Sequence, residues 1–147
     1  MGFYRSGVYP WLVSVFGDPA PIQAARRKLL SAADGVVLEV GIGAGANLPH
    51  YDRTRVTKLF GLEPNRAMLR RAKQRTRGIG IDVEFLDLPG ERIPLGDASI
   101  DCVVSTFTLC TISGVDQALR GIRRVLKPGG GLLFLEISVA ADAGIRR

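Results

Sequence analysis

The chain has 147 residues, the length of a single domain, and a domain of this size buries roughly two-thirds of its unfolded surface. Hydrophobic residues make up 46% and charged residues 23%, which excludes a disordered or fibrous protein. The net charge of +6 admits anionic partners, but no aromatic residue interleaves with the basic run at 66–77. A stacking platform for single-stranded nucleic acid is therefore not indicated, and a solvated helix face is the simpler interpretation of this run.

The cysteines and the single histidine offer no metal-binding pattern. Cys102, Cys110 and His50 lack the paired spacing of a metal site. Because no secretory signal precedes the cysteines, a reduced, cytoplasmic compartment fits best.

The sequence is predicted to divide into a helical N-terminal segment, residues 1–34, and a core, residues 35–147. The apolar stretch from Val8 to Phe16 is too short for a bilayer, which needs about 20 apolar residues. It could lie on a membrane surface, cover a substrate as a lid, or pack against the domain. The aromatic residues that would form the lid are Phe3, Tyr4, Tyr9, Trp11 and Phe16.

Strands and helices alternate along the chain. The prolines at 19 and 21 suit a helix start, and Gly35 ends that helix. Strands are expected at 36–40, 56–62, 82–86, 100–106 and 132–137. Asn65 is expected to cap a second helix, and Ser113 with Asp116 to form a capping box for a third that runs to Leu126 and is stopped by the Pro-Gly-Gly at 128–130.

This alternation predicts an α/β fold, a Rossmann-like, doubly wound, mostly parallel sheet in a three-layer α/β/α arrangement. The apolar strand at 100–106 suits a sheet covered on both faces. Ligands bind such sheets at the carboxyl ends of the strands, near the switch in strand order.

A glycine-rich loop follows the first strand and carries the strongest signal, with Gly41, Gly43 and Gly45 in G-x-G-x-G spacing. Glycine permits positive φ and a close approach of a ligand to the backbone. A dinucleotide site expects G-x-G-x-x-G before a long helix, whereas here Pro49 follows closely. Glu39, two residues before the first glycine, would oppose a pyrophosphate and favour a ligand with an ammonium or sulfonium group.

A second acid, Glu63, stands at the end of the second strand, about 20 residues beyond the glycine loop. A carboxylate there can accept hydrogen bonds from both hydroxyls of a ribose. Together, the loop and this acid favour a sulfonium nucleoside over NAD.

Four segments in this order resemble the class I S-adenosylmethionine-dependent methyltransferase superfamily, in its ubiquinone/menaquinone-type and methyltransferase-like thiol methyltransferase group. They lie at 37–45, 61–65, 96–104 and 126–131, within a resemblance over about residues 35 to 138. The resemblance implies S-adenosyl-L-methionine as cofactor. The cofactor-binding residues that it implies are Glu39, Gly41, Gly43, Gly45, Asn47, Glu63, Pro64, Gly90, Glu91, Thr106 and Leu109. Thr106 and Cys110 are the candidates for positioning the substrate, and no catalytic acid or base is expected.

The sequence departs from the family in two places. Pro89 stands where many relatives have an acid that reads the adenine amino group, so Gly90 or Glu91 is expected to substitute. The chain also contains five strands of the usual seven and stops about ten residues after the fifth. It is then expected to be a fragment, to cover the exposed sheet edge by homodimer formation, or to fold marginally.

The resemblance implies methyl transfer to a small-molecule or lipid-like acceptor, such as a thiol or quinone, by in-line displacement. The proline-aromatic motif of amino-methylating nucleic-acid enzymes is missing after the fourth strand, so nucleic acid is not the expected partner. Two alternatives stay open: an RNA methyltransferase that uses the basic helix, and a cofactor-binding module without turnover. The protein is expected in the cytoplasm, in contact with a membrane surface if the N-terminal segment binds one.

Overall fold

A computed structural model describes residues 17–136, which contain a five-stranded, wholly parallel sheet in the order β3-β2-β1-β4-β5. The strands are β1 (Gly35–Val40), β2 (Val56–Leu62), β3 (Asp82–Leu86), β4 (Ile100–Thr106) and β5 (Leu126–Leu135). The helices are α2 (Ala20–Leu30), the 3₁₀ turn η1 (Leu48–His50), α3 (Arg66–Arg75) and α4 (Val115–Val125). The predicted α/β, doubly wound fold is confirmed.

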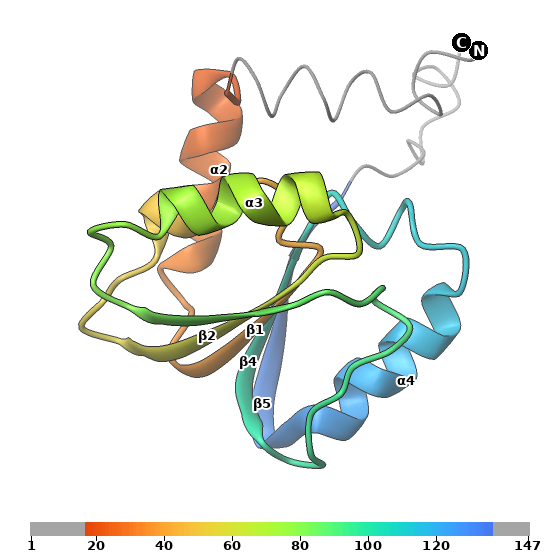
Figure 1. Ribbon diagram of the computed structural model, residues 1–147. Coiled ribbons are helices and arrows are strands. Elements are labelled where there is room, and N and C mark those ends of the chain that lie inside the picture. Colours follow the sequence, from red (N-terminus) through yellow and green to blue (C-terminus); the bar gives the residue numbers. More distant parts are fainter. Residues whose placement is uncertain (1–16, 137–147) are drawn as a thin grey trace, which may run out of the picture.

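Helices cover both faces of the sheet, as three layers require (Figure 1). On one face, Leu30 of α2 and Leu69 of α3 join a cluster with buried residues of β1, β2 and β4. On the other face, Ile122 and Val125 of α4 pack on Leu38 and its neighbours. Since Leu30 of α2 is fully buried in the first cluster, α2 is part of the domain core.

The strand order reverses at β1. The chain first adds β2 and β3 on one side of β1, then crosses to place β4 and β5 on the other. Val40 and Ser105 are register partners at the carboxyl ends of β1 and β4. These two ends form the switch point at which an open α/β sheet binds ligands.

The predicted strands at 56–62, 82–86 and 100–106 and the Asn65 cap are confirmed. Asn65 Oδ1 accepts hydrogen bonds from the backbone N–H groups of Ala67 and Met68, at 2.9 and 3.2 Å. The lid predicted from the aromatic residues at 3–16 falls outside the described residues.

Two local predictions at α4 and β5 are wrong. Gly114, not Ser113, is the N-cap of α4, and no side chain caps that end. The helix ends at Val125 and β5 begins at Leu126, earlier than predicted. The Pro-Gly-Gly segment belongs to the strand because Leu126 and Gly131 pair with residues of β4 across a register shift. Of the predicted last strand, residue 137 lies beyond the described part.

Candidate functional site

The loop after β1 depends on its three glycines for its shape. Gly41, Gly43 and Gly45 have φ of 73°, 55° and 84°, which side chains of L-residues rarely adopt. A Cβ on Gly41 would lie 2.3 Å from Thr108, and one on Gly45 would lie 2.6 Å from Leu48. A Cβ on Gly43 would meet no protein atom within 4 Å. The loop is therefore packed at its two ends and open at its centre, where a ligand can approach the backbone.

Glu63 lies against the centre of this loop. Its carboxylate accepts hydrogen bonds from the backbone N–H of Gly43 at 3.1 Å and from that of Asn65 at 2.9 Å. Partial burial raises the pKa of Glu63, and the two N–H groups lower it again in part. The acid at the end of β2 and the glycine loop after β1 thus meet at the same edge of the sheet.

Glu39 is buried beneath the loop, with 1% of its surface exposed. Its carboxylate oxygens accept hydrogen bonds from Asn47 Nδ2 at 2.8 Å and from the Tyr51 hydroxyl at 2.7 Å. Burial raises the pKa of Glu39 to about 7, while Tyr51, Asn47 and the charge of Arg26 lower it. An acid held in this way gains stability as an anion when a positive charge binds next to it.

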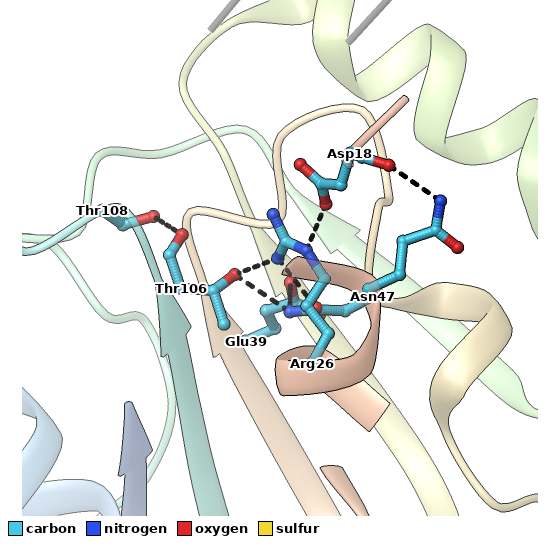
Figure 2. A network of polar contacts seen from close by, with 7 residues as sticks. Asp18, Arg26, Glu39, Asn47, Thr106 and Thr108 are labelled. Carbon is cyan, nitrogen blue, oxygen red and sulfur yellow. Dashed lines mark hydrogen bonds and ion pairs between the residues drawn. The ribbon is translucent and has the colours of Figure 1, made fainter. Parts of the chain in front are cut away.

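A buried arginine completes a polar network at the ends of β1 and β4. Arg26 is 5% exposed, and its Nη1 donates to Asn47 Oδ1 at 2.9 Å and to Thr106 Oγ1 at 2.7 Å. Asn47 Nδ2 also donates to Thr106 Oγ1 at 3.1 Å. The Nε of Arg26 pairs with the carboxylate of Asp18, as Figure 2 shows. The site thus contains a buried cation and a buried acid bridged by one amide.

The loop that follows β4 is held by an acid at the end of β5. Glu136 accepts hydrogen bonds from the backbone N–H groups of Thr108, Leu109 and Cys110, at 3.1, 3.0 and 3.3 Å. Phe107, the first residue of this loop, has a φ of 54°, and the guanidinium of Arg26 lies 5.1 Å from the centroid of its ring. Strained backbone of this kind clusters at functional sites, where the surrounding structure holds it in place.

The remaining predicted residues lie at the edges of this arrangement. Gly90 is buried, and a Cβ there would lie 2.7 Å from Ile112. Glu91 accepts a hydrogen bond from the backbone N–H of Gly114 at 3.2 Å and lines a hollow of about 610 Å³ beside α4. Pro64 is exposed between Glu63 and the Asn65 cap. Neither Gly90 nor Glu91 has a hydrogen bond to the glycine loop among the contacts of the described residues.

The chain matches the family model of a methyltransferase domain over residues 38–134, which is more than half of its length. The chain belongs to this methyltransferase family. The C-methyltransferase UbiE of ubiquinone and menaquinone biosynthesis from Escherichia coli O1:K1 is 35% identical over 106 residues, which cover 69% of this chain. The match covers 42% of UbiE, so the chain spans less than half the length of that relative.

Solved structures give the same fold. A methyltransferase from Aquifex aeolicus that depends on S-adenosylmethionine superposes with a TM-score of 0.73 at 23% identity, over 91% of this chain and 77% of that one. The [4+2]-cyclase SpnF superposes with a TM-score of 0.65 at 27% identity, over 76% of this chain and 42% of its own. Because a cyclase shares the fold, the fold alone does not determine the reaction.

The residues of the site suit S-adenosylmethionine, the cofactor of this methyltransferase family. The space above Gly43 admits a ligand against the backbone, and Glu63 beside it can accept ribose hydroxyls. Burial raises the pKa of Glu39 to about 7 despite the charge of Arg26, and a sulfonium or ammonium group bound next to this carboxyl would favour its anionic form.

Sequence reasoning missed three residues of this site: Arg26, Tyr51 and Glu136. Arg26 stands one helical turn before Leu30, and this i, i+4 spacing on the buried face of α2 could have marked it. Glu136 could have been noticed as an acid at the end of the last strand. Tyr51 gives no comparable signal, because its partner Glu39 is a neighbour only through the bend of the loop.

Proposed function

We propose that this chain binds S-adenosylmethionine across the glycine loop and transfers its methyl group to a small-molecule or lipid-like acceptor, such as a thiol or a quinone. The observation that carries the proposal is the hydrogen bond between Gly43 and Glu63 beside the buried Glu39. In this proposal Glu63 accepts the ribose hydroxyls and Glu39 faces the cation, and the open space above Gly43 supports it, since a Cβ there would meet no protein atom within 4 Å.

When bound, the cofactor supplies an activated methyl group that a nucleophile can take by in-line displacement. The protein's own residues then have to orient the reactants and exclude water, and alignment alone can contribute roughly 7–11 kcal/mol. Thr106, fixed by Arg26 and Asn47, stands at the end of β4 where the acceptor would approach. No general base is required if the acceptor is a thiolate.

The loop at 107–112 is our candidate for the acceptor side. Leu109 and Ile112 are partly buried against the core cluster between α4 and the sheet, and Cys110 is exposed. Glu136 fixes the backbone of this loop, so these side chains would present a defined apolar surface. Apolar lining of this kind suits a small or lipid-like molecule better than a nucleic acid.

Isothermal titration calorimetry with S-adenosylmethionine, its demethylated product and NAD tests the cofactor assignment. We expect micromolar binding of the first two and none of NAD. Transfer of a labelled methyl group is then measured into thiols, quinols and RNA. Labelling of thiol or quinol supports the proposal, whereas binding without any transfer favours a cofactor-binding module that does not turn over.

The RNA alternative rests on the basic residues of α3. In the structure, Arg66 of this helix pairs with Asp87 at 2.7 Å, and Lys73 lies 5.8 Å from the ring centroid of Phe85. Two cationic side chains of α3 therefore contact other residues of the same protein. Labelling of RNA, with binding that weakens steeply as salt increases, would favour the RNA enzyme instead.

The partners would include a second copy of the chain at the outer edge of β5. Among the described strands, β5 pairs only with β4, and Phe134 on it is 60% exposed. An unpaired edge with an exposed aromatic side chain invites pairing with another chain. Sedimentation of wild type and Phe134→Lys tests this, with a dimer expected for the first and a monomer for the second. A wild-type monomer at high concentration would refute it.

No helix within residues 17–136 has the length and apolar character needed to cross a membrane.

A further inference from the structure

Arg26 is a cation that the protein keeps almost entirely out of water. Its side chain and that of Asp18 are each 6% exposed. Burial of two such groups is costly unless their charges are paired and their hydrogen bonds satisfied. Here the pairing depends on Asp18, which stands in the chain just before α2 and not in the sheet (Figure 2).

The position of this pair matters more than its strength. Arg26 donates to Thr106 at the end of β4 and to Asn47 in the loop after β1, so its guanidinium lies at the switch point of the sheet. Asn47 in turn donates to Glu39 at 2.8 Å. One amide therefore connects a buried guanidinium with a buried carboxylate.

This pairing of opposite charges matches the two ends of an α-amino acid. An amino acid carries an ammonium and a carboxylate on the same carbon, so a site for it needs an anion and a cation a few ångströms apart. Glu39 and Arg26 provide these charges beside the glycine loop. A guanidinium is also the side chain best suited to a carboxylate, which it binds with two parallel hydrogen bonds.

We propose that Arg26 binds the carboxylate of the methionine half of the cofactor, and that the carboxylate of Asp18 occupies this place until the cofactor arrives. This inference rests on the proposed function. Asp18 and the ligand compete, because two carboxylates on one buried guanidinium repel each other where little water screens them. Cofactor binding therefore releases Asp18 from Arg26.

Decarboxylated S-adenosylmethionine is the probe that separates this inference from general cofactor binding. It keeps the nucleoside, the sulfonium and the amine and lacks only the carboxylate. Calorimetry with this ligand and with S-adenosylmethionine is carried out on wild type, Asp18→Asn and Arg26→Lys, and a thermal melt of each variant verifies that it is folded.

Asp18→Asn removes the competitor, so we expect S-adenosylmethionine to bind about three- to tenfold more tightly and the decarboxylated ligand to change by less than about twofold. Arg26→Lys loses the bidentate contact, so we expect S-adenosylmethionine to bind at least about tenfold more weakly with little change for the decarboxylated ligand. If Arg26→Lys does not fold, the Asp18→Asn comparison alone decides the question.

Equal changes for both ligands would overturn the inference, since the carboxylate would then make no contact with Arg26. Weaker binding of S-adenosylmethionine by Asp18→Asn would also overturn it, because Asp18 would then support the site. If wild type binds neither ligand, the proposed function itself is wrong. If wild type binds both and only the variants disagree, the proposed function stands and this inference fails.

Discussion

The carboxylate of Glu63 lies 3.1 Å from the backbone nitrogen of Gly43 and accepts its hydrogen bond. Glu63 lies in the loop after β2 and Gly43 in the loop after β1. Because these two strands pair in parallel, the loops that follow them lie at the same edge of the sheet. This contact fixes the middle of the glycine loop against the acid proposed to bind ribose. A change at either residue is therefore expected to affect ligand binding more than it affects the fold.

A methyl group on Gly43 is expected to obstruct the ligand. In Gly43→Ala the alanine must adopt a φ of 55°, which costs about 1 kcal/mol of stability. Its Cβ projects into the space proposed for the cofactor. We expect the affinity for S-adenosylhomocysteine, the demethylated product of the cofactor, to fall at least about tenfold, and calorimetry measures this change.

Gly78→Ala is the matched control for this change. Gly78 has a φ of 81° and likewise no protein atom within 4 Å of a Cβ, but it lies in the turn after α3. It should lose a similar amount of stability and keep its affinity. If Gly43→Ala and wild type bound S-adenosylhomocysteine with equal affinity, the centre of the loop would not be part of the ligand site.

Stability should depend on pH through Glu39. Burial raises its pKa in the folded state from 4.5 to about 7, so between these values the folded protein holds a proton that the unfolded chain has released. The free energy of unfolding contributed by this group therefore falls as pH rises through this window, by at most about 3 kcal/mol. Urea denaturation at pH 5, 6, 7 and 8 measures the fall.

Glu39→Gln isolates this contribution, because Glu63 also has a raised pKa and shifts the curve in the same direction. The variant should lose less stability than wild type between pH 5 and 8. Parallel curves for the two proteins would mean that the carboxyl of Glu39 has an ordinary pKa in the folded state. A cationic ligand should bind more tightly as Glu39 ionises, and this part of the pH dependence should be lost in Glu39→Gln, while any part due to Glu63 remains.

Glu136 is expected to protect the amides of the loop after β4. In Glu136→Ala, the N–H groups of Thr108 and Leu109 lose a charged acceptor, so their hydrogen exchange should accelerate about tenfold or more. The amide of Gly114, which is bonded to Glu91, should keep its rate.

The reciprocal variant, Glu91→Ala, should accelerate exchange at Gly114 and leave the amides of Thr108 and Leu109 unchanged. Uniform acceleration of all three amides in either variant would indicate a general loss of stability and would contradict a local role for these acids.

The sequence predicted the α/β fold and the bounds of three strands, and it singled out the two acids of the proposed site. β2 and β4 are short, mainly apolar runs and β3 alternates polar and apolar residues, and turn residues bound all three, so local pattern determines their bounds. The start of β5 was not predictable in this way. The segment from Leu126 to Gly131 becomes part of the strand only because it pairs with β4, which lies earlier in the chain. Glycine and proline lower the strand propensity there, and the non-local pairing overrides it.

The buried network was hidden for a related reason. Arg26 stands among basic residues of a helix that reads as amphipathic, and its burial results from contact with Asn47 and Thr106, which are 21 and 80 residues away. Glycine loops and strand-end acids have recognisable local patterns, whereas the only local mark of Arg26 is its i, i+4 spacing to the buried Leu30.

The most direct test of the account is the affinity of S-adenosylhomocysteine for Glu63→Ala, measured by calorimetry beside wild type and Glu84→Ala. Glu84 is an exposed glutamate of β3 that pairs with Lys58, so its loss controls for the removal of one surface carboxylate. We predict a loss of at least about tenfold for Glu63→Ala, because the ribose hydroxyls lose their acceptor, and no change for Glu84→Ala. Equal affinities of all three proteins would contradict the account, because the acid beside Gly43 would then make no contact with the ligand.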